Sequence, residues 1–321
     1  MRVLVAGATG FVGRRLCRAL QDAGHEVVAM TRHPDDYSGP GVPVHGDVHA
    51  PDSLPGALSG DDGRRGWSGA TLPPRSATTG TGRADAAYYL VHSLDAPDFA
   101  RRDAAAAQAF GEAAGEAGVR RIVYLGGLGD DADALSAHLR SRRAVEGLLG
   151  AGGVAVTTLR AGIIVGHGGI SWELTRQLVQ HLPVMVTPTW VRTRTQPIAI
   201  DDVVRYLVAA LTLPLPGSRA FEIGGPEVLE YVTMLRRVAT IEHRPLLVLP
   251  VPLLSPGLSS WWLALVTDVD TATGRALVDS MTNEVVVRDD AIRALVPFEP
   301  MSYDQAVRQA LRERAQETDP E

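Results

Sequence analysis

The chain has 321 residues, of which 45% are hydrophobic, and a formal net charge of -6. This length is enough to bury a full core in one large domain or in two interlocked ones. A mildly acidic chain has no electrostatic preference for a polyanion, so we expect no nucleic-acid partner. Cys17 is the only cysteine. An intrachain disulfide and a cysteine-built metal site are therefore excluded, and we predict no metal site.

The chain starts on an apolar segment with no charged leader, and no apolar run approaches the ~20 residues needed to cross a bilayer. We therefore expect a cytoplasmic protein without a transmembrane segment. Cys17 shares a predicted helix with Leu16, which favours a packed, inert thiol.

Strand-like and helix-like segments alternate through the first half of the chain. The predicted strands are residues 3–6, 26–31, 42–45, 86–92, 121–126 and 154–159, and the predicted helices are residues 14–23, 52–58, 97–117 and 135–149. This alternation is typical of a parallel sheet with helices on both faces.

The first strand runs directly into a glycine-rich turn, and a helix follows. Glycine is needed in such a turn for tightness, for close approach to a pyrophosphate, and for close packing of helix on strand. The helix directs its free N–H groups and its positive dipole end at the phosphates. The turn therefore predicts a dinucleotide site built from Gly7, Thr9, Gly10, Phe11, Val12 and Gly13.

Residues 59–83 interrupt the alternation with glycine, serine, threonine, arginine and proline. Such a segment buries too little apolar surface to offset its ordering entropy, so we interpret it as a mobile surface insertion. A substrate lid is the alternative, with Trp67 and Leu72 as its only large apolar residues.

Beyond residue 166 the pattern changes. Helices are predicted at residues 171–182, 201–211, 231–242 and 304–316, with a short strand at 220–223. Residues 246–254 are apolar but contain Pro250 and Pro252, which disfavours a long regular element there.

Several motifs resemble one family. They are the turn at 6–13, Gly46-Asp47-Val48, and the segments 88–93, 119–129, 138–142, 159–164, 196–202 and 223–226. Together they are similar to the extended short-chain dehydrogenase/reductases, and in particular to an atypical NAD(P)H-binding, epimerase/dehydratase-like branch. The resemblance runs from residue 1 to about residue 287, apart from the insertion.

The resemblance implies an α/β fold, a Rossmann-type doubly wound parallel sheet with a smaller, interlocked C-terminal substrate region. It divides the chain into a nucleotide-binding domain, residues 1–165, and a substrate-binding region, residues 166–321. The strand at 220–223 is expected to return to the main sheet.

The end of the second strand indicates which nucleotide is preferred. NAD-binding folds place an Asp or Glu there for the ribose hydroxyls, whereas this chain has Arg32 followed by His33. A guanidinium suits a 2'-phosphate, so NADP(H) is preferred and NAD(H) is the alternative. Arg14 joins this phosphate cluster or is simply exposed, and the alternative for Arg32 is a solvated strand end.

The resemblance implies further cofactor contacts. Asp47 and Val48 would meet the adenine, although Asp47 has the equal alternative of a turn acid. His92 is either a cofactor contact or a structural residue. The remaining predicted cofactor contacts are Leu90, Val91, Gly126, Gly127, Arg142, Ala161, Gly162 and Ile163.

The family's catalytic Tyr-x-x-x-Lys pair and its strand-end hydroxyl are absent. His138 and Arg142 occupy the places of the pair, four residues apart on one helical face, and Gly126 and Gly127 end the strand. Arg142 can hold a ribose hydroxyl but cannot release a proton. For His138 three interpretations stay open, namely a proton donor, a cofactor or substrate contact, and a packed helix residue.

Large apolar side chains near Trp172, at residues 182–186 and at 258–265 favour an apolar small-molecule substrate. We predict Trp172 and Gln196 as substrate-binding residues. The alternatives are ordinary core or a homodimer surface, and Trp261 with Trp262 also suits a membrane interface or a partner.

These observations favour an NADP(H)-binding oxidoreductase that reduces an apolar carbonyl or quinone-type compound with a non-standard active site. The rival hypothesis is a non-catalytic NAD(P)H-binding redox sensor, regulator or assembly factor. Sugar-nucleotide epimerisation or dehydration is disfavoured, because that chemistry relies on the missing tyrosine.

Overall fold

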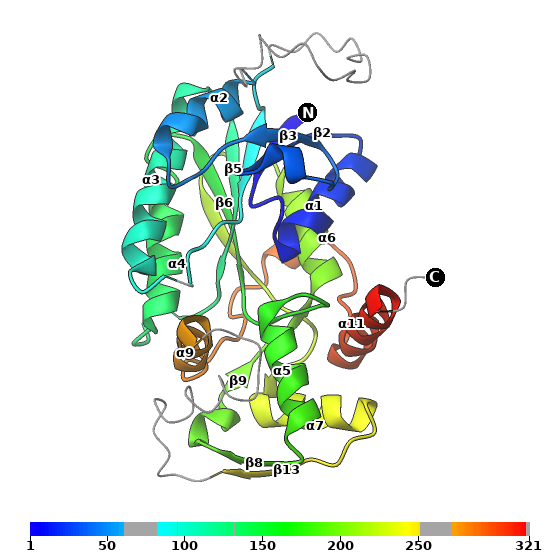
Figure 1. Cartoon of the computed structure of the whole chain (residues 1–321). Coiled ribbons are helices and arrows are strands. Elements are labelled where there is room, and N and C mark those ends of the chain that lie inside the picture. The colour runs from blue at the N-terminus through cyan, green and yellow to red at the C-terminus, as the bar shows by residue number, and fades with distance from the viewer. Residues whose placement is uncertain (61–81, 95, 131, 251–270, 319–321) are drawn as a thin grey trace.

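A seven-stranded parallel sheet, in the order β11-β6-β5-β4-β1-β2-β3, forms the centre of the molecule (Figure 1). The computed structural model describes residues 1–60, 82–94, 96–130, 132–250 and 271–318. The first six strands are β1 Arg2–Ala6, β2 Glu26–Thr31, β3 Val42–His45, β4 Ala86–Tyr89, β5 Arg121–Gly127 and β6 Ala155–Ala161. The helices that connect them are α1 Phe11–Asp22, α2 Leu54–Ser59, α3 Phe99–Glu116 and α4 Ala137–Leu148. The predicted Rossmann-type fold is confirmed, and the strand order reverses between β1 and β4, where such folds bind ligands.

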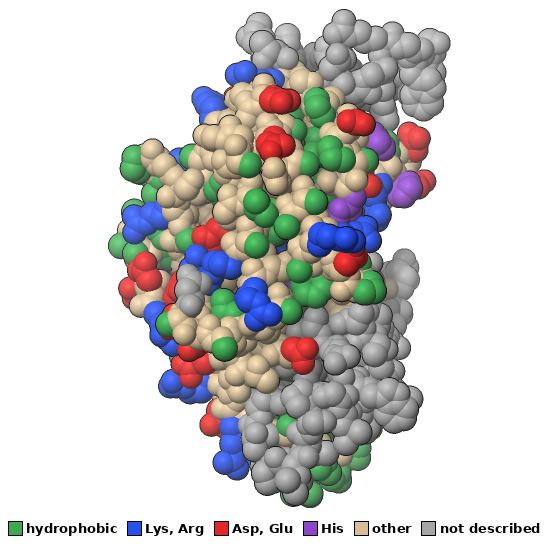
Figure 2. Space-filling view, turned by 90° about the vertical axis from the view of Figure 1, so that its left-hand side faces the viewer, with side chains coloured by type: hydrophobic (Ala, Val, Ile, Leu, Met, Phe, Trp, Pro, Cys, Tyr) green, Lys and Arg blue, Asp and Glu red, His purple; other side chains and the backbone are tan. Residues whose placement is uncertain are grey.

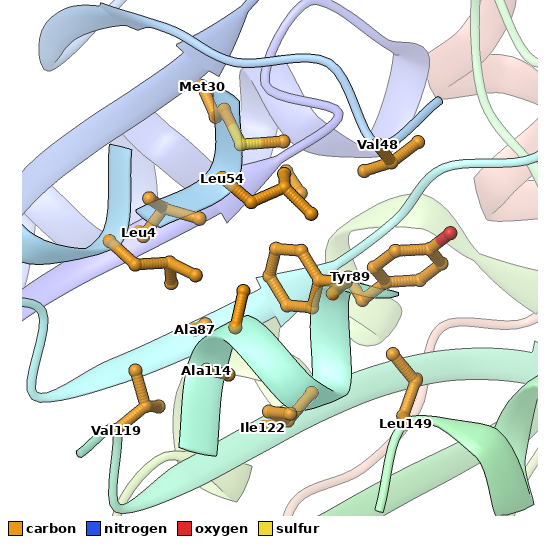
Figure 3. Packing of buried hydrophobic residues seen from close by; sticks show 14 of the residues in the cluster. Leu4, Met30, Val48, Leu54, Ala87, Tyr89, Ala114, Val119, Ile122 and Leu149 are labelled. Carbon is orange, nitrogen blue, oxygen red and sulfur yellow. The ribbon is translucent and has the colours of Figure 1, made fainter. Parts of the chain in front are cut away.

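The two faces of the sheet are covered by different helices because successive strand residues point to opposite sides. On β1, Leu4 and Ala6 belong to the core beneath α2, α3 and α4, whereas Val3 and Val5 belong to the core on the α1 side. Figure 3 shows the first of these cores, in which Leu4, Tyr89 and Leu149 come from distant parts of the chain.

Small residues let α3 pack unusually close to the end of α4. A Cβ on Gly111 would lie 2.5 Å from the Leu149 carbonyl oxygen, and one on Gly115 would lie 2.2 Å from the Gly152 oxygen. The alanine-rich sequence of α3 thus reflects its close packing on α4 and on the loop that follows it.

Some element ends differ from the predictions. Strand β4 ends at Tyr89 rather than at residue 92. Leu90 N still donates to the Ala6 oxygen, but beyond Leu90 the chain no longer pairs with β1. Helix α1 begins at Phe11, three residues earlier than predicted, with Gly10 as its N-cap. Helix α4 begins at Ala137, where the Ser136 hydroxyl accepts a hydrogen bond from Leu139 N.

The second half of the chain adds to the main sheet and also builds a smaller region below it. Its helices are α5 Ile170–His181, α6 Ile200–Ala210, α7 Tyr231–Ile241, α9 Thr271–Ser280, α10 Ile292–Leu295 and α11 Tyr303–Thr318. Its strands are β7 Ile164–Val165, β8 Val184–Thr187, β9 Arg194–Thr195, β10 Ile198–Ala199, β11 Arg219–Ile223, β12 Leu229–Glu230 and β13 Leu247–Pro250. Short 3-10 helices lie at Pro34–Asp36, Pro51–Ser53 and Thr189–Arg192.

Strand β11 pairs in parallel with β6, and α6 packs beside α1 on the face of the sheet opposite α3 and α4 (Figure 1). Residues beyond 166 therefore complete both the edge of the sheet and one of its covering layers. The two halves of the chain are interlocked.

The proline-containing stretch forms one short strand, β13, which pairs in parallel with β8. Met185 and Val248 point into the core of the lower region, whereas Val184 and Leu247 are exposed. Most of the predicted insertion, residues 61–81, and the stretch 251–270 with Trp261 and Trp262 lie outside the described residues. The lid and interface interpretations of these segments stay predictions.

Candidate functional site

The glycine-rich turn has the close packing that the sequence predicts. Gly7 has a φ of +91°, and its carbonyl oxygen accepts a hydrogen bond of 3.0 Å from Gly10 N. A Cβ on Gly13 would lie only 2.0 Å from that same oxygen. The first turn of α1 therefore sits directly on the strand-end loop, with its N-terminus facing the edge of the sheet where β1 and β4 end.

A crevice of about 1150 Å³ opens at this edge of the sheet. Of the predicted cofactor residues, the following line it: Gly7, Thr9, Arg14, Arg32, His33, Asp47, Val48, Val91 and His92. Gly10 and Gly13 belong to the turn but do not line the crevice. The other predicted contacts do not line this crevice: Phe11, Val12, Leu90, Gly126, Gly127, Arg142, Ala161, Gly162 and Ile163.

The crevice is basic. Five arginines line it against two aspartates, Asp36 and Asp47. Arg14 is held to the turn, since its Nε donates to the Thr9 oxygen at 2.7 Å. Figure 2 shows arginine and histidine side chains gathered near the right-hand edge of one face of the molecule. This excess of cations suits a ligand that carries several phosphate charges.

Part of this arginine cluster was not predicted from the sequence. Arg15, Arg18 and Arg102 also line the crevice. The signal for Arg18 was available, because it follows Arg14 by four residues and so shares its helical face. No local signal marks Arg102, which comes from α3 and reaches the crevice only through the tertiary fold.

Asp47 stabilises the turn that follows β3 through two hydrogen bonds. Its Oδ1 accepts a hydrogen bond of 2.9 Å from His49 N, and its backbone N donates to the Ser53 hydroxyl at 2.9 Å. It also lines the crevice, so the turn role and the predicted adenine contact are compatible. Val48 beside it is buried in the core.

His138 is held by protein groups on both ring nitrogens. Its Nε2 accepts from Arg142 Nε at 3.3 Å, and its Nδ1 lies 3.1 Å from the Ser280 hydroxyl. Because Nε2 is the acceptor, the proton of the neutral ring lies on Nδ1. Burial, and then the charges of Arg142 and His92, lower the pKa of His138 to about 3. The ring is therefore neutral near pH 7 and has no imidazolium proton to donate.

Ser280 belongs to a set of hydrogen bonds that fastens the end of α9 to the start of α4. Its hydroxyl lies 3.0 Å from that of Ser136, whose backbone N donates to Asn283 Oδ1 at 2.9 Å. Asn283 Nδ2 in turn donates to the Ala134 oxygen at 3.1 Å. We call Ser136, His138, Ser280 and Asn283 the α4–α9 clamp.

The end of β5 leaves little space for the side chain that would carry the missing hydroxyl. A Cβ on Gly127 would lie 2.8 Å from Leu139 Cδ2 and 3.6 Å from Arg142 Cγ. Helix α4, which carries His138 and Arg142, thus packs against the glycine at the end of β5. The departures from the family's pattern at positions 127, 138 and 142 are therefore compatible with one another.

The residues at and just beyond the end of β6 connect neighbouring segments through backbone hydrogen bonds. Leu128 N donates to the Ala161 oxygen at 2.8 Å, and Ile198 N donates to the Ile163 oxygen at 2.9 Å. Ala161 and Ile163 therefore tie β5 and β10 together at the same end of the sheet, with Gly162 between them. None of the three lines the crevice.

The two predicted substrate residues are engaged within the protein. Trp172 is 1% exposed and packs in the core of the lower region. The side-chain amide of Gln196 donates to the Gly225 oxygen at 2.7 Å and accepts from Val287 N at 3.0 Å. Neither side chain lines the crevice.

Across the described ranges, no group of three or more His, Cys, Asp or Glu side chains is arranged to hold a metal ion. In the same part of the chain, none of the helices has both the length and the apolar character needed to span a membrane.

The fold and the glycine-cradled basic crevice define the class of the protein as a dinucleotide-binding Rossmann protein. A profile of the family described as NAD(P)H-binding matches residues 7–212. The chain belongs to this NAD(P)H-binding family, in the atypical part of the short-chain dehydrogenase/reductases.

Solved structures support the fold. The chain superposes on the triphenylmethane reductase of Citrobacter sp., complexed with NADP(H), with a TM-score of 0.72 and 15% identity, covering 97% of this chain and 100% of that one. A nucleoside-diphosphate-sugar epimerase from Staphylococcus aureus gives 0.71 and 15%, covering 96% and 100%. The Bordetella bronchiseptica enzyme WbmH, in complex with NAD+, gives 0.67 and 15%, covering 98% of each.

One curated protein shows local similarity. The 2-alkyl-3-oxoalkanoate reductase of Stenotrophomonas maltophilia (strain K279a) is 39% identical over 64 residues. The matched segment spans 19% of this chain and 19% of that reductase. The comparisons thus describe an NAD(P)H-binding, oxidoreductase-like protein.

Proposed function

We propose that the protein binds NADP(H) in the arginine-lined crevice and reduces an apolar carbonyl or quinone-type compound. The observation that carries the proposal is Arg32, at the end of β2 and in the crevice wall, where an NAD-binding fold would place a carboxylate. A guanidinium there pairs with a 2'-phosphate, and a carboxylate would repel it.

The residues present fit the nucleotide. Gly13 leaves no room for a Cβ, which would lie 2.0 Å from the Gly7 oxygen, so the start of α1 packs directly on the turn. The free N–H groups of that first helical turn are suited to a pyrophosphate. Arg14, Arg18 and Arg32 supply positive charge around the same space. When bound, the nicotinamide supplies the hydride.

The chain's own residues then have limited roles. Arg142 donates hydrogen bonds but does not release a proton. His138, neutral and an acceptor from Arg142, orients that arginine rather than supplying a proton. Reduction would therefore draw its proton from another donor or from water, which favours substrates whose reduction needs little acid catalysis.

The names of two similar proteins support an apolar substrate. One is a 2-alkyl-3-oxoalkanoate reductase and the other a triphenylmethane reductase, and both names describe compounds with large apolar parts. Trp172 and Gln196 stay proposed as residues that shape the substrate region from within.

A second candidate is a nucleotide-binding sensor or regulator without turnover. The α4–α9 clamp favours it, because both nitrogens of His138 are already engaged. In that case the protein would bind NADPH tightly and consume none.

The test is titration of NADPH and NADH by calorimetry on the parent and on Arg32→Ala. We expect the variant to lose about tenfold in NADPH affinity and little in NADH affinity, because one charge-assisted contact to the 2'-phosphate is removed. Arg236→Ala, an exposed arginine on α7, is the control and should change neither. Equal losses for both nucleotides would exclude the NADP preference.

The parent is then mixed with NADPH and a panel of quinones and alkyl ketones, and the absorbance of NADPH is followed. Consumption with any of them supports the reductase. Tight binding with no consumption supports the sensor.

A further inference from the structure

The C-terminal helix reaches the wall of the crevice through one ion pair. Arg15, on α1, lines the crevice. Its Nη2 donates to Glu313 Oε2 on α11 at 2.7 Å, although the two residues are 298 positions apart in the chain. Their side chains are 29% and 28% exposed. The pair therefore joins the first helix of the chain to the last one beside the crevice.

Two further contacts hold the same guanidinium. Nη1 donates to the Phe11 oxygen at 3.3 Å, and Nη2 donates to the His167 oxygen at 3.0 Å. The guanidinium carbon also lies 4.9 Å from the centre of the Phe11 ring. Within the described ranges, the contacts of Arg15 use three of the five N–H donors of a guanidinium. The remaining two can serve a ligand in the crevice.

The Glu313 carboxylate is itself held in place. Its Oε1 accepts a hydrogen bond of 2.9 Å from Gln309 Nε2, one helical turn earlier on α11. The same amide donates to Asp201 Oδ2 at 2.8 Å, in the first turn of α6. Glu313 thus has one oxygen bound within α11 and the other on Arg15, which fixes the orientation of the carboxylate.

The anchors of Arg15 indicate which part of a nucleotide it would meet. Phe11 is the first residue of α1, and the loop 166–169 packs on its ring, since a Cβ on Gly169 would lie 2.8 Å from Phe11 Cζ. Arg32, in contrast, follows the end of β2. A Rossmann fold receives the pyrophosphate at the start of its first helix. Arg15 is therefore placed for the diphosphate, and Arg32 for the 2'-phosphate.

We propose that Glu313 is a positioning residue, supplied by the C-terminal helix, that fixes the Arg15 guanidinium beside the diphosphate of the bound nucleotide. The inference rests on the proposed function in one respect, which is that a nucleotide occupies the crevice. It depends neither on the preference for NADP(H) nor on turnover. It makes α11 a part of the nucleotide site.

The sign of the effect separates positioning from the general field of the carboxylate. A negative charge near a diphosphate repels it, so removal of the charge alone should tighten nucleotide binding. Removal of an anchor has the opposite effect. The guanidinium fork makes directional hydrogen bonds, and an unanchored fork must lose rotational freedom when the ligand binds.

The experiment is calorimetric titration of NADPH and NADH into the parent and into Glu313→Gln, which keeps the shape of the side chain and removes its charge. We expect the variant to bind both nucleotides about fivefold more weakly, because both contain the diphosphate. Glu317→Gln is the matched control. It removes the same charge one helical turn further along α11, where Glu317 contacts the ring of His167. It should bind both nucleotides at least as tightly as the parent does.

A double-mutant cycle with Arg15→Ala separates positioning from general damage to α11. If Glu313 acts through Arg15, the Glu313→Gln change causes no loss of affinity in the Arg15→Ala background. Arg15→Lys gives a second variant should Glu313→Gln fail to fold. It keeps the positive charge without the planar fork, so we expect about fivefold weaker binding of both nucleotides.

Different results overturn the proposed function and the role of Glu313. A parent that binds neither nucleotide overturns the proposed function, and this inference with it. If the parent binds NADPH, the role of Glu313 alone is overturned by a Glu313→Gln variant that binds as tightly as the parent or loses affinity for NADPH only. Additive effects in the cycle, or an Arg15→Lys variant that binds like the parent, overturn it as well.

Discussion

The two ends of the site are built differently. The crevice between β1, β2 and β4 is open, about 1150 Å³ in volume, and lined by five arginines. At the other end, Arg142 is hydrogen-bonded to His138, and His138 is also hydrogen-bonded to Ser280 within the α4–α9 clamp. Under the proposed function, binding the nucleotide and reacting with it would therefore be separable. The first depends on preformed backbone and charge, and the second on groups that are held inside the protein.

The largest expected effect tests the open end. Gly13→Ala places a Cβ 2.0 Å from the Gly7 oxygen, and because the obstacle is backbone, the helix or the turn must move. We expect a cost of about 3 kcal/mol in unfolding free energy and loss of measurable NADPH binding.

Denaturant unfolding and calorimetric titration measure these two effects. Gly147→Ala, on α4, is the control, since nothing lies within 4 Å of its added Cβ. It should be neutral or stabilise by up to about 1 kcal/mol. A Gly13→Ala variant that binds like the parent would show that the turn is not the phosphate cradle.

The next prediction concerns pH at the closed end. The pKa of His138 falls from 6.5 to about 3 on folding, so the unfolded chain binds an extra proton between these values. The stability from this group is therefore present above pH ~6.5 and lost as the pH falls towards ~3. Between about pH 7.5 and about pH 5 the parent should lose about 2 kcal/mol that His138→Gln does not lose.

The measurement is urea unfolding of both proteins across this range. If the two curves of stability against pH run parallel, His138 is not the buried neutral residue described above.

The smallest effect is expected from loosening the clamp. Ser280→Ala removes the hydroxyl that lies 3.1 Å from His138 and 3.0 Å from Ser136. We expect a loss of about 1 kcal/mol in stability with unchanged affinity for NADPH. A weaker NADPH affinity would mean that the two ends are coupled, and the comparison above would have to be abandoned.

Much of the fold was predictable because its signals are local. Apolar strands that end at glycines and alternate with helix-like segments specify the first half of the chain. The short strands β7 to β10 carry two to four residues each, too few for a period to emerge, and β13 contains Pro250. These strands form only because the chain around them brings their partners together.

The candidate site divides in the same way. The turn and Arg32 follow from spacing along the chain, and the structure places both in the crevice. Arg102 sits in an alanine-rich helix with no neighbouring motif, and it reaches the crevice only through the tertiary fold. The engagement of His138 by Ser280 joins positions 142 residues apart, which no local pattern reveals.

Strand β11 has a practical consequence for anyone who wishes to shorten the protein. A fragment that ends near Val165 would keep the glycine-rich turn yet leave the backbone of β6 unpaired along one side. Bare strand borders of this kind recruit other chains, so such a fragment should self-associate rather than serve as a minimal nucleotide-binding unit. Any shortened form of the protein should therefore retain the residues through Ile223.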